Sequence, residues 1–257
     1  MAELPVHTLI GRENREGGLL LCGLNHGYSK EDERQDVAGI DRSDPRKSFF
    51  SDGEVNDYPF RNRIVSWFSL WGFELARRNE TAGAFEKSMI QTNWLQTCSN
   101  NMNGINTQQA CIEDSESFIQ TCETLKPELI FFFGRELFWA FASPALNEKV
   151  ESIFGARVGE IRWVQKNVFF NGKPRRRFRF GFQQYEKLTV VTLPHATGAQ
   201  GVANDYIEAF KPEMAEVIKA WWVRHEEKLT QRSSGTAQKR GSPLTLLQGL
   251  PQFRKRF

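Results

Sequence analysis

Four short apolar runs, well separated along the chain, most strongly limit the folds that this sequence can adopt. The runs are Leu19–Gly23, Met89–Thr92, Leu129–Phe133 and Leu188–Leu193. Each is too short for a typical helix and lacks the alternation of a half-buried strand, which is typical of strands buried on both faces. Strands that alternate with helices form a parallel sheet with helices on both of its faces. We therefore expect an α/β fold, a three-layer α/β/α arrangement with a central four-stranded parallel sheet.

Two apolar stripes with helical spacing support this fold. One covers residues 60–75, directly after Pro59, and the other covers residues 206–222. With 40% apolar residues among 257, the chain can bury one sizeable core. We expect a single domain over residues 1–230. Residues 231–257 carry six basic residues and no acid, and we expect them to form a flexible tail.

A strongly basic segment occupies residues 168–182, and we call it the basic hairpin. Asn171-Gly172 is a typical two-residue hairpin turn between arms that contain aromatic residues. The cations are Lys173, Arg175, Arg176, Arg177 and Arg179. Phe178 and Phe180 alternate with the last of them. Such a pattern suits contact with nucleic-acid phosphates. A solvated ribbon with no partner is the alternative, because runs of charge are usually only solvated.

The cysteines indicate a reducing compartment. The chain has four cysteines, Cys22, Cys98, Cys111 and Cys122, and no two of them form a Cys-x-x-Cys motif. Cys22 lies in an apolar run where a packed thiol is expected. The sequence also has no charged-then-apolar signal segment and no apolar run long enough to span a bilayer. We expect a cytoplasmic protein, monomeric and not bound to a membrane, with no metal and no cofactor. A dinucleotide enzyme is not favoured, since no G-x-G-x-x-G follows the first apolar run.

Polar residues follow each of the four predicted strands. Asn25 and His26 follow the first, Asn93 ends the second, Arg135 follows the third and His195 follows the fourth. Ligands bind beyond the carboxyl ends of the strands in an open parallel sheet, so these side chains should gather at one edge. Each residue alone could equally satisfy a turn, as most asparagines after strands do. The convergence of all of them favours a site.

These residues resemble the motifs of the uracil-DNA glycosylase superfamily. Gly23-Leu24-Asn25-His26-Gly27 is similar to its first motif, Tyr58-Pro59-Phe60 to its base-stacking position, and Thr92-Asn93 to its base reader. Leu193-Pro194-His195 is similar to the last motif, and Lys126–Gly134 resembles the third strand with its glycine turn. The resemblance covers about residues 17–225 in the family's order.

The resemblance implies a base-flipping enzyme that acts on DNA. Phe60 would stack on the flipped base, Asn93 would bind its edge, and His26 and Gly27 would contribute to the base-binding site. His195 would donate a hydrogen bond to the departing base, and Asn25 would orient the attacking water. Outside the base-binding site, the expected DNA contacts come from the five cations of the basic hairpin, Arg135 and Thr197. No lysine nucleophile matches the site, so we expect a monofunctional enzyme that leaves an abasic site.

Departures from the family's motifs bear on the substrate. His26 stands where relatives have Pro, and Ala196-Thr197 where they usually have Pro-Ser. Gly27 occupies the place where the strictest uracil enzymes carry a tyrosine that crowds the C5 edge of the base. Without that side chain a 5-substituent is not excluded, as in the mismatch-type branch of the family, which has a glycine there. Branches with an iron–sulfur cluster carry two cysteines ahead of the first motif, and this chain has none before Cys22.

The open C5 side at Gly27 and the long charged loop over residues 29–58 favour a base larger than uracil. We expect either uracil or a 5-substituted cytosine, hydroxymethylated or glucosylated as in phage DNA, which would make the enzyme part of antiphage defence. Repair of uracil or mismatches is the alternative. A nucleic-acid-binding protein with this fold but no chemistry is the alternative from another class, and the missing Pro and Ser favour it.

Overall fold

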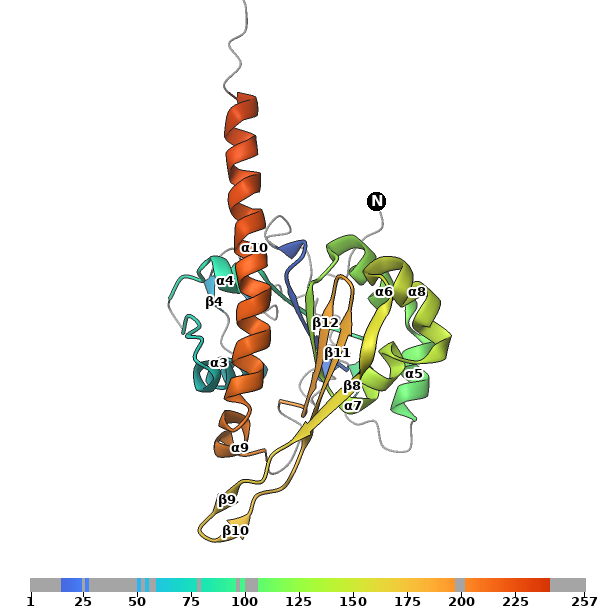
Figure 1. Ribbon diagram of the computed structural model, residues 1–257, viewed down its shortest axis with the longest axis vertical. Helices are drawn as coiled ribbons and strands as arrows, with labels where there is room; N and C mark the ends of the chain where they lie inside the picture. The colour runs from blue at the N-terminus through green and yellow to red at the C-terminus, as the bar shows by residue number, and fades with distance from the viewer. Residues whose placement is uncertain are drawn as a thin grey trace, which may run out of the picture.

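The computed structural model describes residues 15–24, 26–27, 50–51, 54–55, 59–77, 80–95, 98–99, 106–196 and 202–240 (Figure 1). For the two-residue ranges 26–27, 50–51, 54–55 and 98–99, and for residues 233–240, it describes the backbone alone.

A six-stranded, mostly parallel sheet forms the centre of the molecule. The strands in spatial order are β5 (Met89–Asn93), β1 (Leu19–Gly23), β7 (Leu129–Phe133), β12 (Thr189–Leu193), β11 (Arg179–Tyr185) and β8 (Arg157–Gln165). The first four strands in this order run parallel, and β11 runs antiparallel to both of its neighbours. All four strands predicted from the apolar runs are confirmed.

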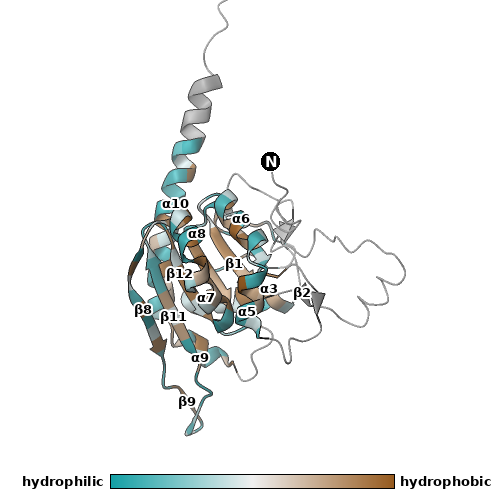
Figure 2. Ribbon diagram, turned by 90° about the vertical axis from the view of Figure 1, so that its right-hand side faces the viewer, coloured by the Kyte–Doolittle hydropathy of each residue, from teal (hydrophilic) through white to brown (hydrophobic). Residues whose placement is uncertain are grey.

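The prediction of a four-stranded sheet is wrong, because β11 and β8 extend the sheet beyond β12. β8 lies at the edge, and none of its residues is fully buried. An edge strand of this kind needs no continuous apolar run. Figure 2 shows the difference, with hydrophobic central strands and a largely hydrophilic β8.

Helices cover both faces of the sheet (Figure 1). One face carries α3 (Pro59–Trp71), α4 (Ala84–Lys87), α9 (Asn204–Glu208) and α10 (Lys211–Arg240). The other carries α5 (Thr107–Glu113), α6 (Glu116–Leu125), α7 (Arg135–Phe141) and α8 (Pro144–Phe154). Successive strand residues alternate between the two cores, with Phe131 in the first and Phe132 in the second. This alternation explains why β7 is apolar at every position and β1 nearly so. The arrangement of helices on both faces of a mostly parallel sheet confirms the α/β fold class.

The two predicted helical stripes differ in outcome. α3 begins at Pro59 as expected and ends before Gly72, whose φ of 93° favours glycine. The second stripe is divided into α9 and α10, and Pro212 stands in the first turn of α10, where a missing backbone N–H is tolerated.

The domain boundary predicted at residue 230 lies inside α10. α10 continues to Arg240, so residues 231–240 of the expected flexible tail are helical. The rest of the predicted tail, residues 241–257, lies outside the described residues. Figure 1 shows the last turns of α10 extending past the body of the domain.

Three short strand pairs complete the structure. β2 (His26–Gly27) pairs in parallel with β6 (Cys98–Ser99), and β3 (Phe50–Ser51) pairs with β4 (Glu54–Val55). β9 (Phe169–Phe170) and β10 (Lys173–Pro174) form the predicted basic hairpin. No helix in the described part of the chain is long and apolar enough to cross a bilayer.

Candidate functional site at the carboxyl edge of the sheet

The four parallel strands end at the same level. Gly23 is paired with Asn93 across β1 and β5, and Leu193 is paired with Phe133 across β12 and β7. Asn93 therefore ends the outermost parallel strand on one side, and His195 follows the outermost parallel strand on the other. With about 4.8 Å between strands, about 14 Å of sheet edge separates β5 from β12. We call this edge, with the residues that follow each strand, the carboxyl edge.

Asn93 faces the layer that contains α3. Side chains along β5 alternate, and Asn93 shares its face with Met89, which packs in the core beneath α3. A Cβ atom on the paired Gly23 would lie 2.5 Å from the Asn93 Oδ1 atom, so any other residue at position 23 would displace this carboxamide. The next residue, Trp94, is buried, stacks on Phe118 at 4.2 Å between ring centroids, and donates from Nε1 to the Cys111 carbonyl. Trp94 thereby fixes the point at which Asn93 leaves the strand.

Phe60 lies on the same face of the sheet, in the first turn of α3. Its half-buried ring meets the ring of Phe133, the last residue of β7, edge-on with 4.9 Å between centroids. Trp67, about two turns further along α3, lies 6.2 Å from the same ring. The aromatic stripe of α3 thus begins at the carboxyl edge, and Phe60 is at its open end.

His195 is half-buried between two buried neighbours, Pro194 and Ala196. Burial lowers the pKa of His195 from its ordinary value, so the ring is neutral at neutral pH and can donate from only one nitrogen. The end of β12 is held to the turn after β7, because Thr192 donates from Oγ1 to the Gly134 carbonyl at 3.3 Å. Gly134 has a φ of 147° and is the kind of position that favours glycine.

Arg135 directly follows this turn at the start of α7. Its side chain is 69% exposed, and its guanidinium lies 3.6 Å from the carboxylate of Glu136. The expected DNA contact is accessible, but a neighbouring acid reduces the local positive charge.

The basic hairpin projects from the carboxyl edge. Asn171 and Gly172 have φ angles of 49° and 72°, which confirms the predicted two-residue turn and matches the positive φ values of a type I′ turn. In the antiparallel pairing of β11 with β12, Gly181 lies opposite Thr192. Arg179, two residues earlier, is therefore level with the residues that follow β12, and the basic hairpin extends beyond it (Figure 1).

The cations of the basic hairpin are not equivalent. Lys173, Arg176, Arg177 and Arg179 are exposed. Arg175 is half-buried, and its Nε atom lies 2.8 Å from Oδ2 of Asp205 on α9. Four of the five predicted phosphate contacts are thus open to solvent, whereas the fifth joins the basic hairpin to α9.

The aromatic residues that face solvent differ from those expected. Phe180 is buried and stacks on Phe210, with 3.7 Å between ring centroids. Phe178 is half-buried against Tyr206. The exposed rings belong to Phe169 and Phe170, beside the Asn-Gly turn. Their position next to the turn, where no third element covers a ribbon, is the sequence signal that would have identified them.

Four predicted site residues have no described side chain. Asn25 and Thr197 lie outside the described residues, and for His26 and Gly27 the backbone alone is described. The pairing of β2 with β6 keeps the segments after β1 and β5 side by side beyond the sheet. Among the described residues, Phe60, Asn93, His195 and the start of the basic hairpin lie along the carboxyl edge, with about 14 Å of sheet edge between β5 and β12.

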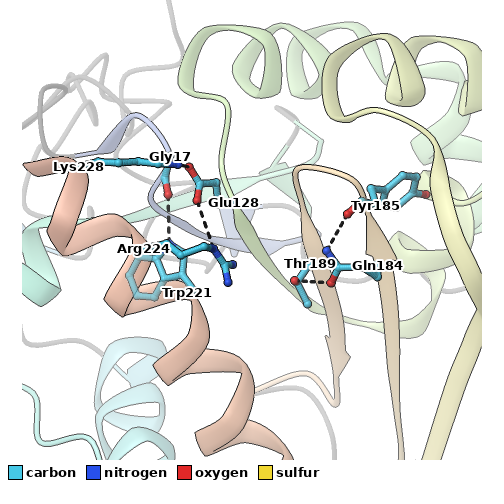
Figure 3. A network of polar contacts seen from close by, with 8 residues as sticks. All are labelled: Gly17, Glu128, Gln184, Tyr185, Thr189, Trp221, Arg224 and Lys228. Atoms are coloured by element: carbon cyan, nitrogen blue, oxygen red, sulfur yellow. Dashed lines mark hydrogen bonds and ion pairs between the residues drawn. The ribbon is translucent and has the colours of Figure 1, made fainter.

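A broad groove of about 1200 Å³ lies at the opposite edge, where the parallel strands begin. Its lining includes Glu128, which pairs with Lys228 and, at 4.0 Å, with Arg224. Nearby, Trp221 donates from Nε1 to the Gly17 carbonyl at 3.1 Å (Figure 3). These contacts fasten α10 to the amino ends of β1 and β7, and none of the predicted site residues lines this groove.

The buried cysteines are structural. Cys22, Cys111 and Cys122 are buried, and burial raises the pKa of each thiol, that of Cys111 to about 12. The protonated form is a poor nucleophile and a poor metal ligand. Within the described ranges, no three histidine, cysteine or acidic side chains form a group that could hold a metal ion.

The chain matches no protein-family model and no curated protein.

Proposed function

We propose that this protein is a monofunctional DNA glycosylase of the uracil-DNA glycosylase type. One observation carries the proposal. Phe60 and Asn93 face the same side of the sheet at the carboxyl edge, His195 follows β12 at that edge, and the basic hairpin extends from it. An aromatic ring, a carboxamide and an imidazole next to exposed cations are the groups needed to bind a flipped base and its phosphates.

The base would be bound by stacking and by hydrogen bonds at its edge. Phe60 supplies the ring, and the Asn93 carboxamide offers both a donor and an acceptor, so it can pair with uracil or, rotated, with cytosine. The segment that includes His26 and Gly27 would close the base-binding site from the end of β1. These contacts recover the unstacking energy, which is a few kcal/mol for one base.

Hydrolysis would break the bond between the sugar C1′ and the base nitrogen. The electron pair of this bond leaves with the base, and a water molecule oriented by the Asn25 side-chain oxygen adds to C1′. The proton that this water loses is transferred through solvent to the departing base anion. Neutral His195 donates its N–H to O2 of the base and stabilises the charge that develops there. The products are the free base and an abasic site, with no covalent intermediate on the protein.

The proposed substrate is a 5-substituted cytosine, hydroxymethylated or glucosylated, in phage DNA. This part of the proposal depends on the sequence at Gly27, which has no side chain to exclude a substituent at C5. A role in antiphage defence follows from that substrate. Release of plain uracil, with no release of modified cytosine, would instead assign the protein to repair.

The test is mass spectrometry of the bases released from uracil-containing, mismatched and naturally modified phage DNAs. We expect release by the wild type, and loss of release in Asn25→Ala, Asn93→Ala and His195→Ala. Gln184→Ala is the matched control, because this carboxamide contacts Thr189 and the Tyr185 carbonyl at the opposite edge of the sheet (Figure 3). Unchanged release by both Asn25→Ala and His195→Ala rules out the mechanism.

The same experiment tests a DNA-binding protein without chemistry. This second candidate is favoured by the exposed cations of the basic hairpin, which need no catalytic group to bind phosphates. Wild-type protein that binds every DNA of the panel and releases no base would establish the second candidate.

A further inference from the structure

The basic hairpin carries two exposed phenylalanines that the proposed chemistry does not use. Phe169 is 61% exposed and Phe170 is 52% exposed, and they are adjacent to the Asn-Gly turn. Lys173, Arg176 and Arg177 belong to the same hairpin and are also exposed. Adjacent apolar rings among cations on a projecting arm indicate a surface that is covered when a partner binds.

The two rings lie on different faces of the ribbon. Phe170 pairs with Lys173, and Phe169 pairs with Pro174. Cross-strand partners share a face, and neighbours along a strand do not. The Arg175 guanidinium lies 4.2 Å from the centroid of the Phe170 ring and covers one face of that ring. Phe169 and Pro174 therefore form the uncovered apolar face of the basic hairpin.

The arm that carries this face is rigidly attached. The Tyr206 hydroxyl of α9 donates to the Phe178 carbonyl at 2.6 Å and accepts from the Phe178 amide at 3.0 Å. The Arg175 amide donates to the Val168 carbonyl at 2.7 Å, and the Arg175 side chain is paired with Asp205. An arm whose backbone is held in this way loses little conformational entropy when it binds.

The arm is also close to the carboxyl edge. β11 is the immediate neighbour of β12, and β8 is the next strand, so the two arms leave the sheet about 5 and 10 Å from the strand before His195. Nucleotides follow one another at about 3.4 Å along a DNA strand. A DNA strand bound at the carboxyl edge therefore reaches the basic hairpin within a few nucleotides.

We propose that Phe169, supported by Pro174, is a stacking site for an unpaired base of DNA outside the base-binding site. Paired bases in a duplex have both faces covered, so only an unpaired base offers a face to this ring, while the surrounding cations bind its phosphates. This site would make the protein prefer unpaired DNA. The inference rests on the proposed function only in taking DNA as the partner.

Nucleic acid is favoured over other partners by the arginines. Among the exposed cations of the basic hairpin, three are arginine and one is lysine. The guanidinium group matches phosphate in a bidentate way and stacks on bases, which an ammonium group does not do. An anionic membrane or a second copy of the chain would also cover an apolar, basic face, so the test includes both.

The test compares the affinity for a single-stranded oligonucleotide with that for its duplex, using fluorescence anisotropy and a sequence without uracil or modified bases. We expect the wild type to bind the single strand roughly tenfold more tightly, and Phe169→Ala to lose most of this preference. Phe169→Trp should keep it. Val158→Ala is the control, because Val158 is 51% exposed near the other end of β8.

A charge variant separates stacking from phosphate contact. Lys173→Ala should weaken binding to both DNAs and reduce the salt slope by about one ion, with the preference for the single strand unchanged. Equal preference in the wild type and in Phe169→Ala overturns the inference. So does binding to anionic phospholipid vesicles without binding to DNA, or a wild-type dimer that Phe169→Ala dissociates.

This outcome is independent of base release. If Phe169→Ala loses the preference for unpaired DNA while no DNA of the modified panel loses a base, the stacking site stands and the glycosylase proposal fails. If the wild type releases a base and Phe169→Ala keeps the full preference, the glycosylase proposal stands and the stacking site fails.

Discussion

Removing a single oxygen atom should loosen the basic hairpin. In Tyr206→Phe the ring still packs against Phe178 and Phe210, but the hydroxyl between the two arms is lost. That hydroxyl donates at 2.6 Å and accepts at 3.0 Å from the backbone of Phe178, and the Lys166 amide points to it at 3.4 Å. Each of the two short bonds contributes about 0.5–1.5 kcal/mol net, so we expect a loss of about 1–3 kcal/mol in the free energy of unfolding.

Urea unfolding and amide hydrogen exchange measure this effect. We expect a lower unfolding midpoint, and exchange of the Phe178 amide that is faster by roughly tenfold or more, because about 1.4 kcal/mol corresponds to a factor of ten. DNA binding through the basic hairpin should also weaken, since the arm is no longer held before it binds.

Tyr185→Phe is the matched control. Tyr185 is also fully buried, but its hydroxyl interacts with the Arg157 side chain and, within the part of the chain that the structure describes, makes no hydrogen bond to the backbone. The same substitution there should leave stability nearly unchanged. Equal effects of the two substitutions, or an unchanged exchange rate at Phe178 in Tyr206→Phe, would refute the reasoning.

Three further predictions concern the body of the domain. Arg61→Met should lower the free energy of unfolding by about 3–5 kcal/mol in thermal and urea denaturation, because it leaves the buried Glu86 carboxylate, now 2.6 Å from the Arg61 guanidinium, without its cation. Arg61→Met combined with Glu86→Leu should recover much of the loss, and no recovery would contradict this account. His195 has a lowered pKa, so below its ordinary value of 6.5 the unfolded chain binds a proton that the folded chain does not. The contribution of His195 to stability should therefore be full above that pH and fall as the pH drops toward the folded-state pKa. Urea unfolding at a series of pH values should show a weaker decline in stability for His195→Gln than for the wild type. An identical decline in both proteins would be evidence against this account. Gly134→Ala should cost about 1–3 kcal/mol in the same assay, because φ is 147° there, and a neutral result would show that the turn can relax.

Much of the fold was predictable because its signals are local. β1 and β7 face a core on both sides, which favours an unbroken apolar run such as Leu129–Phe133. The turn at Asn171-Gly172 needs positive φ at two positions, a requirement that this dipeptide meets by itself. Since parallel strands end together, the residues after them were expected at one edge, and Asn93 and His195 are found there.

The rest depended on contacts between segments far apart in the sequence. β8 and β11 join the sheet only because each pairs with a neighbour, a bond pattern that leaves little trace in side-chain periodicity. Phe180 and Phe169 stand in similar basic surroundings, yet Phe180 is buried because α10 begins beside it and Phe210 stacks on it. Phe169 is exposed because nothing in the described part of the chain covers the end of the arm.

The amino-acid sequence by itself therefore determined the parallel strands, the basic hairpin and the polar residues at the carboxyl edge, since each follows from neighbours along the chain. Only the tertiary structure decided which cations and rings remain open to a partner. Arg175 is bound by Asp205 and Phe178 is held by Tyr206, while Lys173 and Phe169 stay exposed. The physical reason is that exposure depends on what packs against a residue, and here that packing comes from α9 and α10, which follow the basic hairpin in the chain.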